Sequence, residues 1–599
     1  MKRRPLFHEH FFQHKWSYLL GSVLLSMSLA LQLVIPLLLE DFTDGIQHLT
    51  IRVSDLWSLA AWFIILGLGI FIFRSSGRIY IFRLSRMLER DLRTKLFTHW
   101  ETLPAEYYQH ERIGNLMAHA VNDVNILRQI GMQGVFQTIE AMVLISITIT
   151  MMAGTINVYL TLLVLLPLPG LTYLAYRFRT SIRMYSLRVQ EAIGTVTSRV
   201  QEFCTGIRII KTYVQEHEEI KKFTKENGEN VKANKQLIRS NSLFASYSQG
   251  IVGLSYLLSI VFGSLLVMKG RISLGEFVAF NTYLSFLVAP IENLGKVINL
   301  FQQGKAADSR LRNVLASEPD IKDEEGIVPL KEIKGEIRIR NLSFQYKNSK
   351  GYALRNINLT IEKGASLAIV GKIGSGKSTL VNLLLRVYNP PRNTIFIDNY
   401  DIRDLPLKLL RTSIGYVPQT NFLFSSTIKE NIAFDPNYYQ DNQIYKAAKQ
   451  AHVYRDIMDF PEGFNTALGE RGLSLSGGQR QRVSIARAMI KQSPIMIFDD
   501  SLSAVDVKTE ERILKTLRSE IKGRTSIIIS HRISTIQKAD KIIVLDEGKI
   551  AEQGTHESLL ERNGIYKNMY ILQSNEFTLE PSTLPFSSER TVRINKRRS

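Results

Sequence analysis

The nonapeptide Gly371-Lys372-Ile373-Gly374-Ser375-Gly376-Lys377-Ser378-Thr379 separates a strand-like apolar run, residues 367–370, from a helix-like apolar run that opens at Leu380. Its glycines allow φ values that other residues avoid, so that consecutive backbone N–H groups can face one anion. The helix that follows adds the positive end of its dipole at the same point. Lys377 can reach the β and γ phosphates of a nucleotide, and the hydroxyl of Ser378 or Thr379 can hold Mg²⁺. The stretch therefore predicts a binding site for ATP and Mg²⁺.

Two later stretches carry residues that suit the same site. Leu475-Ser476-Gly477-Gly478-Gln479 opens a helix with small residues and a hydroxyl, which favours contact with a γ phosphate at a helix N-terminus. Ile495-Met496-Ile497-Phe498-Asp499-Asp500 is an apolar strand that ends in two carboxylates. We expect Asp499 to bind the metal ion.

Single polar residues complete the predicted site. Gln419 follows Tyr416-Val417-Pro418, and His531 follows a strand that ends at Ser530, so both can lie near the γ phosphate. Tyr346 can stack on the adenine. The predicted Mg²⁺ ligands are Ser378, Gln419 and Asp499, and the predicted catalytic residues are Gln419, Asp500 and His531.

Composition separates this chain from nucleic-acid-binding proteins. The 599 residues allow several domains, and a hydrophobic content of 45% suggests the average of a very apolar part and a soluble part. The formal charge of +20 comes from scattered Lys and Arg residues with no basic patch interleaved with aromatics, so basic loops beside a membrane are the better interpretation. The one cysteine, Cys204, excludes an internal disulfide.

Six apolar runs in the first half are long enough to cross a membrane; they are residues 19–39, 56–73, 135–153, 158–176, 251–268 and 277–301. The long connections 74–133 and 177–250 begin with clustered arginines, so the positive-inside rule places them in the cytoplasm. Their helical apolar spacing predicts that the spans continue as long cytoplasmic helices. Their tips, near 107–117 and 203–213, contain Gly114 and Gly206, which could allow a turn into a short crossing helix. The tips either dock on another domain or are plain surface turns.

Some polar residues interrupt the apolar half. Glu140 lies inside the third span, where it either lines a substrate cavity or bonds to a neighbouring helix or the inner interface. The sixth span contains further candidates for a cavity lining, namely Asn281, Tyr283 and Glu292. Residues 1–15 are basic and aromatic, which fits a helix lying on the membrane lipid or a disordered leader.

The composition also predicts the domain boundaries. Residues 1–316 form the membrane domain, 317–334 an acidic linker, 335–573 a soluble α/β domain and 574–599 a disordered basic tail. Short strands are expected at 337–339, 366–370, 395–397, 495–498, 525–529 and 541–545. A cytoplasmic nucleotide domain is thus joined to a multi-pass domain of the cytoplasmic membrane.

From residue 19 to residue 573 the chain resembles a half-transporter of the ATP-binding cassette (ABC) exporter family, because the nonapeptide, the Leu475–Gln479 signature and the 495–500 strand occur in that order. The resemblance implies the type I/type IV exporter fold, with six spans followed by one nucleotide-binding domain. It also implies a dimer in which each ATP lies between the phosphate loop of one half and the signature of the other. Residues 503–506 resemble the family's D-loop, and residues 466–472 resemble the segment that touches the loop tips.

One position departs from the family pattern. Hydrolytic sites in the family have Glu directly after the Mg²⁺-associated Asp, whereas this chain has Asp500. Because Asp is one methylene shorter, its carboxylate would lie too far from the attacking water, unless a tilted backbone restores the distance. We therefore expect this chain to be the poorly hydrolysing half of a heterodimer whose partner has the intact Glu.

The expected function is ATP-driven export of small amphipathic, drug-like compounds. The alternatives are a lipid or peptide exporter of the same fold, and a nucleotide-gated regulator or channel without active transport. Accumulation of cargo against a gradient separates a pump from a gate. No nucleic acid partner is expected.

Overall fold

The computed structural model describes residues 5–49, 52–323, 326–347, 349–434, 438–469, 472, 475–500, 512–513, 515–516, 519–520 and 522–578. The chain divides into two compact units. The first contains Met1–Thr102 and Glu111–Glu318, and the second contains Leu103–His110 and Pro319–Ser599. The short segment Leu103–His110 thus belongs to the second unit, although its neighbours in the chain belong to the first.

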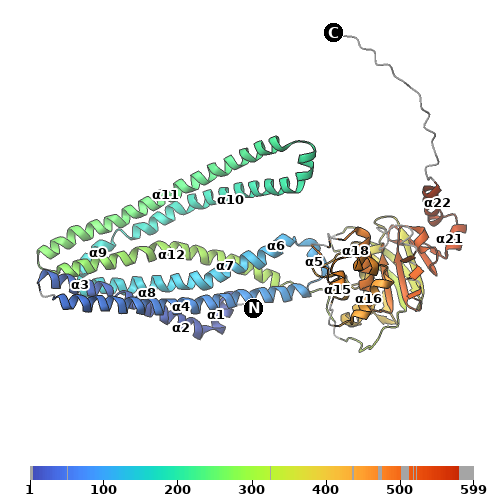
Figure 1. Cartoon of the computed structure of the whole chain (residues 1–599), viewed down its shortest axis with the longest axis horizontal. Helices are drawn as coiled ribbons and strands as arrows, with labels where there is room; N and C mark the ends of the chain where they lie inside the picture. The colour runs from blue at the N-terminus through green and yellow to red at the C-terminus, as the bar shows by residue number, and fades with distance from the viewer. Residues whose placement is uncertain are drawn as a thin grey trace, which may run out of the picture. The chain divides into compact units, whose positions relative to one another are not determined.

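The first unit is helical throughout its main elements (Figure 1). Its helices are α1 (Leu6–Gln13), α2 (Lys15–Gln32), α3 (Ile35–Gln47), α4 (Val53–Thr102), α6 (Ile113–Ala118), α7 (Val124–Gln129), α8 (Val135–Met151), α9 (Val158–Leu165), α10 (Pro169–Thr212), α11 (Glu216–Met268) and α12 (Leu274–Leu315). The π-helical segments His119–Asp123, Ile130–Gly134 and Met152–Ile156 follow α6, α7 and α8 directly.

Among the described residues, six helical segments are long and apolar enough to cross a membrane. They are Lys15–Gln47, Asp55–Thr102, Ile113–Ile156, Val158–Thr212, Glu216–Met268 and Leu274–Leu315. Each contains one of the six predicted spans, so the prediction of six spans is confirmed.

Several helices are much longer than a span requires. The helices α4, α10 and α11 have 50, 44 and 53 residues, whereas about 20 residues cross the hydrocarbon core. The prediction of long helical extensions is therefore confirmed. The predicted turn at Gly206 is wrong, because α10 continues to Thr212 and the chain turns only before Glu216, where α11 begins. A single glycine costs a helix only about 1 kcal/mol, too little to break one of this length.

Small residues bring α2 and α4 close together. A Cβ atom on Gly77 would lie 2.9 Å from Cγ of Leu25 and 3.0 Å from the carbonyl oxygen of Gly21. Such contacts let two backbones approach and gain dispersion energy in lipid, where the hydrophobic effect between helices is absent. At the N-terminus, α1 is fixed to α12 because the backbone N–H of Leu6 donates to Oδ1 of Asp308 at 2.7 Å.

The described residues of the second unit form two sheets. The larger has the order β10-β9-β3-β8-β7-β6, and the smaller, antiparallel sheet has the order β2-β1-β4-β5. The strands are β1 (Ile337–Phe344), β2 (Leu354–Ile361), β3 (Ser366–Gly371), β4 (Ile395–Ile397), β5 (Tyr400–Asp401), β6 (Ile414–Val417), β7 (Ile495–Asp499), β8 (Thr525–Ile529), β9 (Lys541–Asp546) and β10 (Lys549–Gly554). All the predicted strands lie in these sheets; β2, β5, β6 and β10 were not predicted.

Helices pack around the sheets of this unit, and Figure 1 shows α15, α16 and α18 gathered together. The helices are α5 (Ala105–His110), α13 (Lys377–Leu384), α14 (Leu407–Thr412), α15 (Ile428–Ala433), α16 (Asp441–Gln450), α17 (Tyr454–Met458), α18 (Gly477–Ile490), α20 (Ile533–Ile536), α21 (His556–Glu561) and α22 (Ile565–Thr578). One buried apolar cluster joins both sheets to α13, and a second joins α15, α16 and α18 to β7. The nucleotide motifs are thus built on two separate parts of the core.

Candidate nucleotide-binding site

The larger sheet brings the predicted residues to one edge. Strands β6, β7, β8 and β3 are parallel neighbours, with Val417 opposite Phe498, Asp499 opposite Ile529, and Ile529 opposite Ile369. Since each strand ends at this edge, the segments that follow them meet there: Gln419 after β6, Asp499 and Asp500 at the end of β7, His531 after β8, and the nonapeptide after β3. In open α/β sheets the carboxyl edge is where ligands bind.

The loop between β3 and α13 depends on its glycines. Gly376 has a φ of +102°, and a Cβ atom there would lie 2.7 Å from the carbonyl oxygen of Ala353. A Cβ atom on Gly371 would lie 2.2 Å from the carbonyl oxygen of Leu545 in β9. Gly374 has a φ of +82° and faces open space. Conformation and crowding therefore both require glycine, and the loop forms the backbone cradle that an anion needs.

Two polar side chains are buried within this cradle. The Nζ of Lys377, which is 8% exposed, donates to the carbonyl oxygens of Gly371 and Lys372 at 2.8 Å each. Burial lowers the pKa of Lys377, and the carboxylates of Asp499 and Asp500 oppose that shift. The Oγ of Ser375 is buried without a hydrogen-bond partner among the described residues. A buried cation and an unsatisfied hydroxyl in a glycine cradle fit the phosphates of ATP.

Asp499 has the surroundings of a metal ligand. It is 6% exposed, and burial and the neighbouring Asp500 raise its pKa, while Lys377, His531 and a hydrogen bond from Tyr416 oppose the rise. Burial and the charge of Asp499 raise the pKa of Tyr416 to about 12, so this hydroxyl remains a donor to the carboxylate. An ionised carboxylate in such a place is costly unless a cation pairs with it. The site therefore fits Mg²⁺, which would neutralise charge on the phosphates.

Asp500 has a left-handed backbone, with a φ of +44°, and its N–H donates to the carbonyl oxygen of Ile529 at 2.9 Å. The Nε2 of Gln419 lies 3.5 Å from its Oδ2, at the limit of a hydrogen bond. The two predicted catalytic groups are thus neighbours, but their contact is long. The left-handed conformation is tolerated by Asp better than by most side chains.

The adenine side of the predicted site is connected to the loop. The hydroxyl of Tyr346, just after β1, lies 2.9 Å from Oγ1 of Thr379. Thr379 is buried and its hydroxyl is engaged, whereas Ser378 is exposed. Of the two hydroxyls, Ser378, which is the predicted Mg²⁺ ligand, is therefore the better placed for the metal ion.

The signature residues are not part of this cluster. The Oγ of Ser476 accepts from the N–H of Gln479 at 3.2 Å, and Oε1 of Gln479 accepts from the N–H of Ser476 at 2.9 Å, so the pair caps α18. Gly477 and Gly478 form the first turn of that helix. Within the described part of the chain, no hydrogen bond or ion pair joins residues 475–479 to residues 371–379. Such an arrangement suits a signature that serves a different nucleotide.

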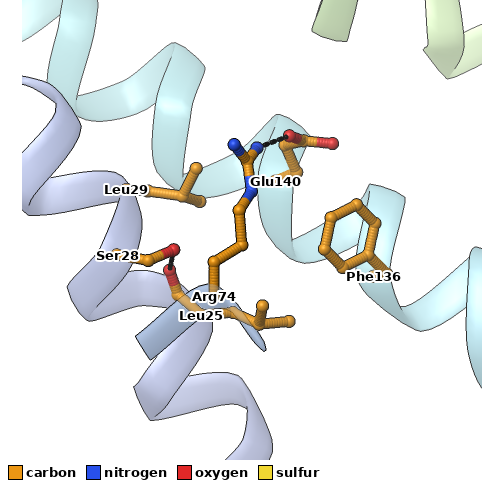
Figure 2. A pocket seen from close by; sticks show the side chains of 6 residues that line it. All are labelled: Leu25, Ser28, Leu29, Arg74, Phe136 and Glu140. Atoms are coloured by element: carbon orange, nitrogen blue, oxygen red, sulfur yellow. Dashed lines mark hydrogen bonds and ion pairs between the residues drawn. The ribbon is translucent and has the colours of Figure 1, made fainter. Parts of the chain in front are cut away.

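Glu140 is paired. The Nη2 of Arg74 on α4 lies 2.8 Å from its Oε1 on α8, and Figure 2 shows this pair beside Ser28 and Phe136. One turn further along α4, the guanidinium of Arg78 lies 5.2 Å from the centroid of the Phe136 ring. Glu140 is therefore bonded to a neighbouring helix, and it also lines the small pocket of Figure 2, so a role in a substrate cavity stays a prediction.

Of the three polar candidates in the sixth span, Glu292 is exposed, whereas Tyr283 and Asn281 are engaged in helix packing. Tyr283 is fully buried and donates to the carbonyl oxygen of Leu33 at 3.0 Å. Oδ1 of Asn281 accepts from Oγ of Ser259 at 3.0 Å. These two side chains therefore join neighbouring helices, as Glu140 does.

Sequence reasoning missed two partners that the structure reveals. Tyr416 is the one polar side chain in β6, and this was the available signal for its hydrogen bond to Asp499. Arg74 follows the second span directly, at the same end as the start of the third span, so the depth of Glu140 pointed to it. The predicted D-loop, 503–506, and parts of the segment 466–472 lie outside the described residues.

Comparison with known proteins agrees with this geometry. Residues 18–291 match the family of the ABC transporter transmembrane region, and residues 354–503 match the ABC transporter family. The chain is 35% identical over 564 residues to a probable multidrug resistance ABC transporter ATP-binding/permease protein, YheI, of Bacillus subtilis (strain 168), covering 94% of this chain and 96% of that protein. It is 36% identical over 490 residues to the ATP-dependent lipid A-core flippase of Syntrophus aciditrophicus (strain SB), covering 81% and 80%.

A solved structure is similar over nearly the whole chain. A bacterial Atm1-family ABC exporter with ATP bound has a TM-score of 0.79 and 27% sequence identity, covering 93% of this chain and 99% of that chain.

Proposed function

The chain belongs to the ABC transporter family, and from this premise we propose that it exports small amphipathic, drug-like compounds as one half of a heterodimer. Its fold is that of an ABC exporter, a multi-pass membrane protein with a cytoplasmic nucleotide-binding domain that couples ATP hydrolysis to transport.

In the proposed site, the 371–379 loop and Lys377 hold the phosphates, Tyr346 stacks on the adenine, and Ser378, Gln419 and Asp499 hold Mg²⁺. The observation that supports this assignment is the convergence of four strand ends on one edge, with a buried lysine beside a buried aspartate. Mg²⁺ would supply charge neutralisation, and the residues of this chain would position the phosphates. Photolabelling of the full chain with an azido analogue of ATP tests the assignment, and labelling that excess ATP fails to suppress would contradict it.

The proposed cargo follows the relatives whose names include multidrug resistance, among them the B. subtilis protein. The lipid A-core flippase supports lipid as the second candidate. Inverted vesicles separate these possibilities from a nucleotide-gated channel. A pump accumulates an amphipathic dye against its gradient only with hydrolysable ATP, whereas a channel gives downhill flux with ATP binding alone. A headgroup-accessibility assay on the same vesicles detects lipid movement.

The surface of α10 supports the need for a second half. Leu171 and Val189 are the only buried residues of this helix among those described, although it has 44 residues. Beyond the membrane span it exposes many apolar side chains; they include Met184, Leu187, Ile193, Val200, Phe203, Ile207 and Ile209. Exposed apolar surface of this extent on a cytoplasmic helix is typical of a protein interface.

Asp500 supports a partner of a different sequence. In a homodimer both sites would have the short carboxylate, and both would lack a base within reach of the attacking water. With a partner that contains Glu at this position, one site hydrolyses ATP and the other mainly binds it. Isolation of the complex from its native membrane tests this point. A second ABC half-transporter with Glu at the equivalent position is the expected companion, and robust ATPase activity of a verified homodimer would refute the proposal.

A further inference from the structure

Two separate parts of the chain connect the nucleotide unit to the membrane unit, and both contact the same small region. One is the segment Leu103–His110, which contains α5 and follows α4 directly. The other begins at Pro319, after α12. The shared region contains Tyr346, which is proposed to stack on adenine, and residues 386–389 after α13.

The α5 side of this region is held by one hydrogen bond. The hydroxyl of Tyr388 donates to Oε1 of Gln109 at 2.9 Å. Tyr388 is only 7% exposed, and its ring meets that of Tyr346 edge to face, with centroids 5.1 Å apart and an interplanar angle of 84°. Phe344 also packs on both rings, with centroids at 5.2 Å from Tyr346 and 6.1 Å from Tyr388. The three rings form one aromatic cluster.

The segment that begins at Pro319 contacts residues that lie next to Tyr346 and Tyr388 in the sequence. Lys347 forms an ion pair with Asp320, and Nδ2 of Asn389 donates to the carbonyl oxygen of Asp320 at 2.7 Å. The fully buried Arg386 donates from Nη2 to the carbonyl oxygen of Lys322 at 3.0 Å. These contacts hold the chain next to each tyrosine, and the two rings are in direct edge-to-face contact, so a movement of one ring can reach the other.

The far end of the cluster reaches the phosphate loop. The hydroxyl of Tyr346 lies 2.9 Å from Oγ1 of Thr379, which is in the first turn of α13. A continuous series of contacts therefore joins Gln109 through Tyr388 and Tyr346 to Thr379. Tyrosine has only two side-chain torsions, so the two rings can transmit a displacement with little loss to internal motion.

We propose that Tyr388 is a positioning residue that couples nucleotide occupancy at Tyr346 to the docking of α5. The proposal rests on the proposed ATP site. Adenine on Tyr346 fixes that ring, the fixed ring orders Tyr388, and the ordered hydroxyl holds Gln109. By thermodynamic linkage the effect is reciprocal, so that docked α5 increases the affinity for ATP by the same factor by which ATP favours docking. Couplings of this kind are about five- to 150-fold, and one hydrogen bond places this one near the low end.

The experiment uses the full-length chain, in complex with its native partner, in lipid nanodiscs. Cys204, the one native cysteine, is replaced by Ser, and Tyr108→Cys places a thiol on α5 at a residue that is 40% exposed. The rate of maleimide labelling at position 108 reports the docking of α5, and photolabelling with 8-azido-ATP, competed by ATP, reports the affinity at the Tyr346 site. Both are measured without turnover.

We expect ATP to slow labelling at position 108 about fivefold. Tyr388→Phe keeps the ring and loses the hydroxyl, so ATP should slow labelling at position 108 by less than about twofold. The affinity for ATP should fall by the same factor by which this effect on labelling decreases. Tyr388→Ala should weaken ATP binding further, because the packing on Tyr346 is also lost. Tyr388→Phe should therefore bind ATP better than Tyr388→Ala and still lack the effect of ATP on labelling at position 108. A merely structural role of Tyr388 would not separate these two measurements. Gln109→Met should reproduce Tyr388→Phe, and Tyr400→Phe, at a 40% exposed tyrosine in β5, should change neither measurement.

Two results overturn the proposal. If Tyr388→Phe binds ATP and keeps the full response at position 108, the relay is absent although the ATP site stands. If the parent complex is not labelled by 8-azido-ATP in this chain, the assignment of Tyr346 fails, and the relay fails with it.

Discussion

Replacing Asp500 by Glu should convert this chain into an active ATPase. The Nε2 of Gln419 lies 3.5 Å from Oδ2 of Asp500, so the present carboxylate barely reaches the neighbouring catalytic group. Glu adds one C–C bond, about 1.5 Å, which is more than a hydrogen bond can stretch. A positioned general base contributes about 10²- to 10⁴-fold to a rate. We expect Asp500→Glu to raise the ATPase rate of the chain expressed alone by about 100-fold, or about 2.7 kcal/mol of barrier.

The backbone at this position opposes part of the gain. A φ of +44° suits Asp better than Glu, and the strain costs about 1 kcal/mol, less than the expected gain. Phosphate release in nanodiscs measures turnover, while thermal unfolding confirms that each variant is folded. Asp500→Asn is the matched control and should change turnover little, because the native group is expected to be out of reach. A folded Asp500→Glu that binds ATP but hydrolyses it no faster than the parent would refute the reasoning, as would a large loss in Asp500→Asn.

Three further outcomes are expected. Lys377→Ala should weaken photolabelling of this chain's own site about tenfold or more, because a charge-assisted contact is lost; equal labelling would contradict its role. Gly477→Asp should abolish ATP turnover of the proposed heterodimer while ATP still binds at Lys377, because it places a negative charge against the phosphate of the ATP held by the partner. Turnover near the parent rate would show that the hydrolysing site belongs to the other half. Asp499→Asn should raise the melting temperature of the nucleotide-free protein at pH 7, because burial raises the pKa of Asp499 and the ionised form destabilises the folded state above that pKa. The same variant should lose stabilisation by Mg²⁺ with ATP, and a lower melting temperature would show that the ionised group is stabilising.

The sequence was sufficient for those parts of the fold that follow from apolar runs and from the backbone freedom of glycine. The strand 495–498 is purely apolar and is followed by carboxylates, so its burial and the place of Asp499 could both be predicted. The glycines of the 371–379 loop have the positive φ values that the motif requires at 371, 374 and 376. Among the strands that were missed, β5 has only two residues, and the edge strand β10 alternates between exposed and half-buried positions, so neither gives an apolar run.

The sequence was insufficient where contacts depend on tertiary packing. Nothing in the spacing of Gln109 and Tyr388 predicts their hydrogen bond, because 279 positions separate them in the chain. The contact between the hydroxyls of Tyr346 and Thr379 also needed the structure, because the two residues lie 33 positions apart in the chain. The prediction of a turn at Gly206 was wrong because it gave more weight to the low helix propensity of glycine than to the packing of α10 against α11.

Binding and hydrolysis of ATP are assigned to different parts of the nucleotide unit. Tyr346 follows β1 of the antiparallel sheet, and its contacts run through Tyr388 to α5. Asp500 follows β7 of the larger sheet, and the Nε2 of Gln419 lies 3.5 Å from its Oδ2. Asp500, which stands where the family resemblance predicts Glu, therefore lies outside the proposed route from the adenine to α5. With this arrangement, a site that hydrolyses ATP slowly would still report that ATP is bound, which is the role of this chain in the proposed heterodimer.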